Sequence, residues 1–246
     1  MASEIKKPII LILGEDGIGG DGTPLNVLRE AYGQAIILAG GFPVWGVDIR
    51  SAEQYVEISD GLLLTDGLDV HVYRFGEMYR EAKEMHPFSR TRDDLDFRLC
   101  ELFIQHKKPI FGIGRGMQIL NICLGGSLVK SLAEAGIPHP GSNPIPALPP
   151  QAATLAYHGI RVEKNTPLEH ILSTIKDVSS CHTRAVQVEN SSMLVAAKGE
   201  DEVIEAIVHP EQPWMGVQWH PELDLVKNPA HLELLNYWIS LIKEEK

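Results

Sequence analysis

The stretch Pro109-Ile110-Phe111-Gly112-Ile113-Gly114-Arg115-Gly116-Met117-Gln118-Ile119-Leu120 carries the strongest structural signal in the chain. Its apolar start predicts a short buried strand, its glycines predict an abrupt turn, and its apolar end predicts a helix. A strand, a tight turn and a helix in this order are typical of a nucleophile elbow, whose central residue has a strained backbone and lies beside the free N–H groups of the helix. That central residue is Gly114, which has no side chain to act as a nucleophile.

Strands and helices alternate along the chain before this elbow, and we expect an α/β fold with a doubly wound, mostly parallel central sheet flanked by helices. The apolar runs expected to form buried strands are 8–13, 43–47 and 61–64. The helices expected between them are 23–39, which opens on Thr23 as cap and Pro24 at the first turn, 52–58 and 91–106. Residues 14–22 are expected to be a flexible loop, because neither a phosphate-binding nor a calcium-binding pattern fits them.

The second half of the chain predicts further strands and a closing helix. The strands expected there are 160–162, 186–188, 193–197, 203–208 and 215–218, with a hairpin turn at 199–201, and the helix begins at Asn228-Pro229. The proline-rich residues 137–152 are interpreted as a surface excursion. At 246 residues, one domain spanning 1–246 is expected.

Charge and composition exclude several classes of partner. The net charge of −11 and the absence of a basic run make nucleic acid and anionic membrane surfaces poor partners. No apolar run approaches the roughly 18 residues of a membrane span, and without a signal-peptide pattern a cytoplasmic protein is expected. Neither a metal nor a cofactor is expected, because the three cysteines lack ligand spacing. The histidines expected to be solvated or capping, without a metal-like grouping, are His71, His86, His139, His158 and His182. Composition leaves the oligomeric state open, a homodimer included.

The elbow resembles that of class I glutamine amidotransferase-like proteins, whose pattern is Gly-Ile-Cys-Arg-Gly-Met-Gln. Segments 39–44, 60–70 and 216–222, the last reading Gly-Val-Gln-Trp-His-Pro-Glu, extend the resemblance over nearly the whole chain, and it is closest to the gamma-glutamyl-GABA hydrolase family. The resemblance implies a flavodoxin-like three-layer sandwich and a Cys-His-Glu mechanism for cleaving gamma-glutamyl amides. Carried over, it assigns Gly114 to the nucleophile position, His220 to the base and Glu222 to the group that orients the base.

The chain departs from the family pattern at two further places. The family's oxyanion loop is usually a Gly-Gly pair, which here reads Asp66-Gly67, so that a carboxylate stands close to where negative charge would develop. In 179–186, Thr183 and Arg184 replace a family His and Gln. Arg115, directly after the elbow, is implied by the resemblance to pair with acidic groups and brace the elbow helix.

Acidic residues are expected around the mouth of the substrate pocket, because the loops after strands one and three open on the same sheet edge as the elbow. These acidic residues are Glu15, Asp16, Asp21, Asp66, Asp69 and Glu77. The residues predicted to line the pocket are Glu15, Asp16, Asp69, Cys181, His182 and Arg184. A functional acidic cluster would favour an amine-bearing ligand such as a gamma-glutamylated polyamine. The alternative is a solvated acidic surface, and Cys181 is either a relocated nucleophile or a buried structural cysteine.

Two functions from different classes therefore stay open. One is a gamma-glutamyl amide hydrolase, acting on a gamma-glutamyl-GABA or gamma-glutamyl-polyamine type of substrate, that lacks its nucleophile at Gly114. The other is a natural pseudoenzyme that binds a small molecule or regulates without catalysis. In both, a small gamma-glutamyl or amine-bearing ligand is the expected partner.

Overall fold

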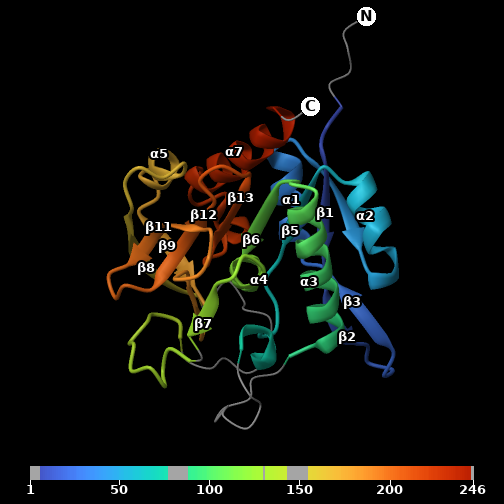
Figure 1. Ribbon diagram of the computed structural model, residues 1–246, viewed down its shortest axis with the longest axis horizontal. Helices are drawn as coiled ribbons and strands as arrows, with labels where there is room; N and C mark the ends of the chain where they lie inside the picture. The colour runs from blue at the N-terminus through green and yellow to red at the C-terminus, as the bar shows by residue number, and fades with distance from the viewer. Residues whose placement is uncertain (1–5, 77–87, 130, 143–154, 245–246) are drawn as a thin grey trace, which may run out of the picture.

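A nine-stranded mixed sheet forms the centre of the molecule (Figure 1), in a computed structural model that describes residues 6–76, 88–129, 131–142 and 155–244. Its strands lie in the order β4 (Phe42–Gly46), β1 (Ile9–Leu13), β5 (Gly61–Leu64), β6 (Ile110–Ile113), β13 (Trp214–Val217), β12 (Ile204–Val208), β11 (Leu194–Gly199), β8 (Ala156–Val162) and β9 (Asp177–Ser180). The strands from β4 to β13 pair in parallel, and those from β13 to β9 pair antiparallel.

Helices cover both faces of this sheet and complete the expected three layers. Successive side chains of a strand point to opposite faces, and Ile10 and Ile12 of β1 pack into one core whereas Leu11 and Leu13 pack into the other. The first core is closed by α1 (Glu30–Leu38), α5 (Glu169–Leu172) and α7 (Ala230–Glu244). The second is closed by α2 (Ala52–Ile58), α3 (Arg90–Gln105) and α4 (Arg115–Cys123), of which α3 and α4 stand before the sheet in Figure 1. The expected α/β fold is confirmed.

The expected helix at 23–39 is wrong in its first third, and the expected flexible loop before it is ordered. β2 (Glu15–Ile18) and β3 (Pro24–Val27) pair as an antiparallel hairpin, and α1 begins only at Glu30. Thr23 does not cap a helix, because its N–H and its hydroxyl both bind Asp21 Oδ1 (3.1 and 2.7 Å) and hold the hairpin turn. Leu25 and Val27 of β3 are about half exposed, so their helix-like spacing reflects no packing against the core.

The other expected elements are confirmed to within a few residues, and several short ones escaped sequence reasoning. The expected hairpin around 199–201 is the β11–β12 pair. The elements that were missed are β7 (Ser127–Val129), which pairs with β10 (Ala185–Gln187), together with β9, α6 (Pro221–Asp224) and the 3-10 helices Ile49–Ser51 and Val72–Phe75. Of the proline-rich segment only residues 137–142 are described, and 143–152 lie outside the described residues.

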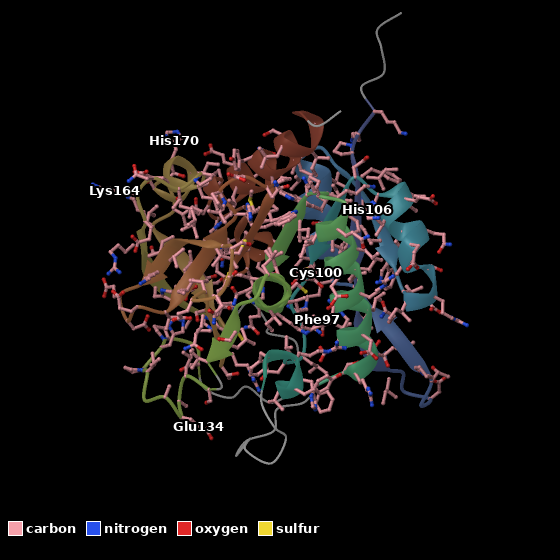
Figure 2. All side chains as sticks on the ribbon, viewed as in Figure 1. Phe97, Cys100, His106, Glu134, Lys164 and His170 are labelled. Carbon is pink, nitrogen blue, oxygen red and sulfur yellow. The ribbon has the colours of Figure 1, made fainter. Side chains whose placement is uncertain are left out.

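Many charged side chains lie at the outer edge of the molecule, and apolar side chains pack between the sheet and its helices. Figure 2 shows Lys164 and His170 at the outer edge of the molecule, near β8 and α5, whereas Phe97 and Cys100 of α3 are buried. Within the described ranges, no helix combines the length and the apolarity needed to cross a bilayer.

Candidate functional site

The loops that follow β1, β5, β6 and β13 meet at one edge of the sheet, beyond the carboxyl ends of its parallel strands. This is the edge at which open α/β sheets bind ligands. The loop after β6 is the elbow, the loop after β5 carries Asp66, and β13 leads into His220.

The elbow is built around Gly114, which joins β6 directly to α4. Its φ of 55° and ψ of −114° are a conformation that residues with a side chain rarely adopt. The turn is fixed by a hydrogen bond from Gly114 N to Val217 O (2.8 Å) on the neighbouring strand. Glycine is also needed at position 116, because a Cβ there would lie 2.0 Å from Leu64 O. The sequence thus predicted both the strand–turn–helix and its crowding.

The carboxylate of Asp66 occupies the space in front of Gly114. A Cβ added at Gly114 would lie 2.4 Å from Asp66 Oδ1, so a side chain at 114 and the side chain of Asp66 exclude one another. The same Oδ1 accepts a hydrogen bond from Arg115 N (2.9 Å), the first N–H of the elbow helix. The positive end of the helix therefore already holds an anion supplied by the chain itself.

His220 lies between two carboxylates. Its Nδ1 contacts Glu222 Oε1 (3.0 Å) and its Nε2 lies 3.5 Å from Asp66 Oδ2. Burial, the largest influence, lowers the pKa of His220, but Glu222 and Asp66 outweigh it and raise the pKa to about 9. At neutral pH the imidazole is therefore protonated. We call Asp66, His220 and Glu222 the elbow cluster.

The side chain of Arg115 points away from the elbow turn and braces α4 against α3. It is buried, and its guanidinium pairs with Asp93 (Nη2–Oδ1, 2.6 Å) and with Asp96. Arg92 binds the same Asp96 (Nε–Oδ2, 2.7 Å) and donates to Thr65 Oγ1 (2.9 Å) at the end of β5. The expected pairing of Arg115 with acidic groups is present, and it ties the elbow helix to the loop that carries Asp66.

The hairpin brings one of its predicted acidic residues to the elbow cluster and directs the other away. A Cβ added at Gly67 would lie 3.4 Å from Glu15 Cγ, so the side chain of Glu15 packs on the loop that contains Asp66. Burial and, next, the charge of Asp66 raise the pKa of Glu15. Asp16, the next residue of β2, is exposed and accepts a hydrogen bond from Ser89 Oγ. Glu15 and Asp16 face opposite sides because alternate residues of a strand do so, and the pocket role of Asp16 stays a prediction.

Two other predicted pocket residues pair with each other. Arg184 Nε donates to Asp69 Oδ2 (3.0 Å), and the Arg184 guanidinium lies over the ring of Phe75, 5.3 Å from its centroid. Asp69 is thus part of an ion pair, and the predicted acidic mouth is less negative than its sequence suggested. Asp21 is bound within the hairpin turn, and Glu77 lies outside the described residues.

Cys181 follows β9 and is partly buried. Burial and, next, the charge of Asp66 raise the pKa of its thiol to about 11. The thiol is therefore protonated at neutral pH, and a protonated thiol is a poor nucleophile. These properties favour the structural role for Cys181 over that of a relocated nucleophile.

The histidines do not behave as expected. His71 does cap a helix, since its side chain accepts from Tyr73 N, but His139 and His182 are buried, and His158 is only partly exposed. His139, His182 and Glu205 offer ligand atoms that all lie within 4.8 Å of one another. The expectation that these histidines form no metal-like grouping is wrong, because strand pairing brings together residues far apart in sequence. His182 belongs to this second group, and His86 lies outside the described residues.

Sequence reasoning missed Arg29 and Tyr32. Arg29 is the residue before α1, where it pairs with Glu15 (3.9 Å), and its charge only partly opposes the rise in the pKa of Cys181. Its Nη1 is buried without a hydrogen-bond partner among the described residues. The Tyr32 hydroxyl accepts from Asp66 N (3.2 Å). Placing a helix over 23–39 hid Arg29, because it made Arg29 an interior helical residue instead of the residue before α1. Tyr32 is helical in both cases, and its spacing indicated only a core residue.

Comparisons with known proteins agree with this geometry. A family model described as Peptidase C26 matches residues 18–222. A candidate glutamine amidotransferase from Schizosaccharomyces pombe is 30% identical over 220 residues, which cover 87% of this chain and 82% of that protein. A gamma-glutamyl-gamma-aminobutyrate hydrolase from Escherichia coli O157:H7 is 30% identical over 233 residues, 90% of this chain and 88% of the hydrolase. The crystal structure of a candidate GMP synthase subunit from Thermoplasma acidophilum has the same fold, with a TM-score of 0.62 at 14% identity, over 98% of this chain and 96% of that one.

Proposed function

The chain belongs to the Peptidase C26 family, and from that premise we propose that it binds a small gamma-glutamyl compound at the elbow without hydrolysing it through a thiolate. In this proposal Gly114 stands where hydrolytic relatives carry their cysteine. The protein keeps the binding edge of a gamma-glutamyl hydrolase and works as a small-molecule binding or regulatory protein.

One observation carries the proposal: the Asp66 carboxylate fills both places that thiolate chemistry needs. Its Oδ1 lies where a side chain at position 114 would begin, and it accepts the Arg115 N–H that could otherwise stabilise an oxyanion. A backbone donor contributes to catalysis only if it is free to meet the charge that develops in the transition state. A carboxylate there both blocks the donor and repels an oxyanion.

The protonation of His220 supports the same proposal. A general base must be unprotonated before it can accept a proton, whereas flanking carboxylates raise the pKa of His220 to about 9. The imidazolium instead neutralises two buried anions, Asp66 and Glu222. In this proposal the elbow cluster is a fixed electrostatic feature of the binding edge.

The charges around the elbow suit the amino-acid end of a gamma-glutamyl group. Arg29 Nη1 is a buried donor with no partner among the described residues, and it could donate a hydrogen bond to an α-carboxylate. Glu15 and Asp66 could hold the α-ammonium group. Because Asp69 is paired with Arg184, fewer carboxylates remain to attract a cationic tail than the sequence suggested. An amine-bearing ligand stays the preferred one within the proposal, because a chain of net charge −11 attracts a cationic far end and repels the far carboxylate of gamma-glutamyl-GABA.

Two measurements on the unmodified chain test the proposal. Calorimetry should detect binding of a gamma-glutamyl polyamine and weaker binding of gamma-glutamyl-GABA, whose far end is a carboxylate, with affinity for the polyamine falling as salt rises. Intact-mass measurement after incubation with either compound should detect no covalent adduct and no released product. A covalent adduct on a cysteine or on Asp66 would make the chain a hydrolase, and failure of both ligands to bind would remove the proposed ligand class. Equal affinities would rule out only the preference for an amine.

A further inference from the structure

We propose that His139, His158, His182 and Glu205 form a binding site for one divalent transition-metal ion of the zinc type. We call these residues the histidine cluster. They come from four segments: the turn after β7, strand β8, the residues after β9, and strand β12. The cluster shares no residue with the elbow cluster, and the inference does not rest on the proposed function.

The three histidines surround one carboxylate oxygen, and the ligand atoms of His139, His182 and Glu205 all lie within 4.8 Å of one another. Glu205 Oε1 lies 3.5 Å from His139 Nε2, 3.8 Å from His158 Nε2 and 3.7 Å from His182 Nε2. These separations are too long for hydrogen bonds, which require about 2.7–3.2 Å. They are close to the edge of a ligand tetrahedron, since atoms about 2.1 Å from a tetrahedral zinc ion are about 3.4 Å apart.

The other ring nitrogen of each histidine fixes which atom faces the centre. His158 Nδ1 contacts Gly159 O (2.9 Å) and His182 Nδ1 contacts Arg184 O (2.8 Å). Backbone carbonyls only accept hydrogen bonds, so both Nδ1 atoms carry the hydrogen, and Nε2 is the atom of each ring that faces inward and is free to bind a metal through its lone pair. His139 Nδ1 is held by Asp201 Oδ2 (2.7 Å). Metal-binding histidines are oriented in this way, by an oxygen acceptor on the second ring nitrogen.

The inward atoms otherwise lack donors. His158 Nε2, His182 Nε2 and both carboxylate oxygens of Glu205 are buried with no hydrogen-bond partner in the described ranges. Ser180 Oγ lies 3.0 Å from His139 Nε2, but it donates its hydrogen to Pro140 O (2.6 Å). Three imidazole nitrogens that offer lone pairs to a fully buried carboxylate are strongly unfavourable unless a cation lies among them.

The donor set selects the class of ion. Imidazole nitrogens suit zinc, copper, iron and nickel, whereas calcium and magnesium prefer sites made of oxygen. His139, His182 and Glu205 supply three ligands whose atoms lie close together, and His158, which approaches Glu205 Oε1, is the nearest candidate for a fourth. Four protein ligands are typical of a structural site. An ion bound here would attach the turn containing His139 to the antiparallel half of the sheet.

Metal analysis of the tag-free chain, dialysed against micromolar zinc, tests the inference. We expect about one zinc ion per chain, a higher Tm with zinc than after chelation, and loss of both in Glu205→Gln and in His182→Gln. The matched control is His231→Gln, which alters another buried histidine outside the cluster and should retain the ion.

A measurement on the unmodified chain keeps the inference testable if the variants do not fold. X-ray absorption at the zinc edge should find nitrogen and oxygen ligands at about 2.0–2.2 Å and no sulfur. Less than a tenth of an ion per folded chain would overturn the inference, and so would sulfur ligation or equal zinc content in the wild type and Glu205→Gln. The cluster would then be a network of protonated histidines.

Discussion

The elbow cluster and the histidine cluster both bury histidine against carboxylate, but they satisfy their charges differently. In the elbow cluster, signs alternate: Asp66 is bound by Arg115 N, and His220 lies between Asp66 and Glu222. In the histidine cluster, the Nε2 atoms of three rings face a carboxylate that has no hydrogen-bond donor among the described residues. The charges of the elbow cluster are nearly balanced within the chain. The histidine cluster lacks a positive charge, which must come from outside the chain.

From this difference we infer a separate function for each cluster, ligand binding at the elbow and metal binding at the histidine cluster. At the elbow, the Asp66 carboxylate accepts a hydrogen bond from Arg115 N, the N–H that in our proposal would otherwise meet a reacting anion. Near the elbow, Glu222 Oε2 and Arg29 Nη1 are buried without a hydrogen-bond partner among the described residues. Of these two atoms only Arg29 Nη1 is a donor that could bind an anionic ligand. In the histidine cluster nothing from the described chain fills the centre, and a cation supplies the missing charge.

The largest expected effect is on amidase activity, when a cysteine is placed at position 114 and the Asp66 side chain is removed from the space in front of it. Gly114→Cys alone should restore little amidase activity, because the new Cβ would lie 2.4 Å from Asp66 Oδ1. Gly114→Cys combined with Asp66→Gly should be faster by about 10²–10³-fold, the usual value of one oxyanion donor. Steady-state rates with gamma-glutamyl-GABA and with a gamma-glutamyl polyamine measure the change.

The two single variants complete this cycle and serve as its controls. Asp66→Gly alone should stay at background, because it frees the donor without supplying a nucleophile. Since both changes act on one transition state, their effects should be coupled. An ordinary enzyme rate from Gly114→Cys alone would mean that Asp66 does not block the site.

The elbow and the histidine cluster also differ in how far the sequence predicts them. The elbow is local: Gly112, Gly114 and Gly116 lie in one short run, so the turn could be predicted from spacing and its resemblance to relatives. His139, His158, His182 and Glu205 share no spacing motif. They meet because the sheet order β12–β11–β8–β9 departs from chain order, and single-sequence reasoning does not supply that order. Arg29 was missed for a third reason, since one misplaced helix start moved it away from the sheet edge.

The next largest effect concerns the pH dependence of stability. The folded-state pKa of His220 is raised from 6.5 to about 9, so its contribution is fully present below pH 6.5 and is lost as pH rises through about 9. A shift of this kind changes the free energy of unfolding by about 1.4 kcal/mol per pH unit over that window. Urea unfolding between pH 6 and 10 should show this decline.

Two variants isolate the contribution of His220 to that decline. His220→Gln should remove it, whatever other groups titrate. Asp66→Asn removes one of the two carboxylates that raise the pKa, so the loss of stability should end at a lower pH and be smaller in total. Identical pH profiles for Asp66→Asn and the wild type would show that Asp66 does not pair with His220 in solution.

A smaller effect on ligand affinity is expected from Arg29, whose Nη1 is a buried donor without a hydrogen-bond partner among the described residues. Arg29→Met should weaken binding of a gamma-glutamyl compound about tenfold, or about 1.4 kcal/mol, because a charge-assisted hydrogen bond is lost. Calorimetry provides the measurement. The matched control is Arg161→Met, an exposed arginine paired with Glu202, which should bind as the wild type does. Equal weakening in both variants would assign the effect to net charge and not to a contact.

The smallest expected effects distinguish the two clusters through neighbouring residues. Ser179 and Ser180 are adjacent on β9 and both are fully buried, yet Ser179 Oγ accepts from His220 N (3.2 Å) while Ser180 Oγ contacts His139 Nε2 and Pro140 O. Each serine changed to alanine should cost about 1 kcal/mol, the usual net value of a buried hydrogen bond. The two variants are chemically identical and matched in burial.

Each variant should nevertheless change one further property, the pH dependence of stability for Ser179→Ala and the zinc content for Ser180→Ala. Ser179→Ala should alter the pH dependence that His220 produces and leave zinc content unchanged, because its hydroxyl touches only the elbow side. Ser180→Ala should leave that pH dependence unchanged and weaken zinc retention, because it frees the turn that carries His139. Urea unfolding across pH and metal analysis measure the two properties on the same samples. If either variant changed both the pH dependence and the zinc content, the elbow cluster and the histidine cluster would be one coupled network. The comparison between two independent sites would then fail.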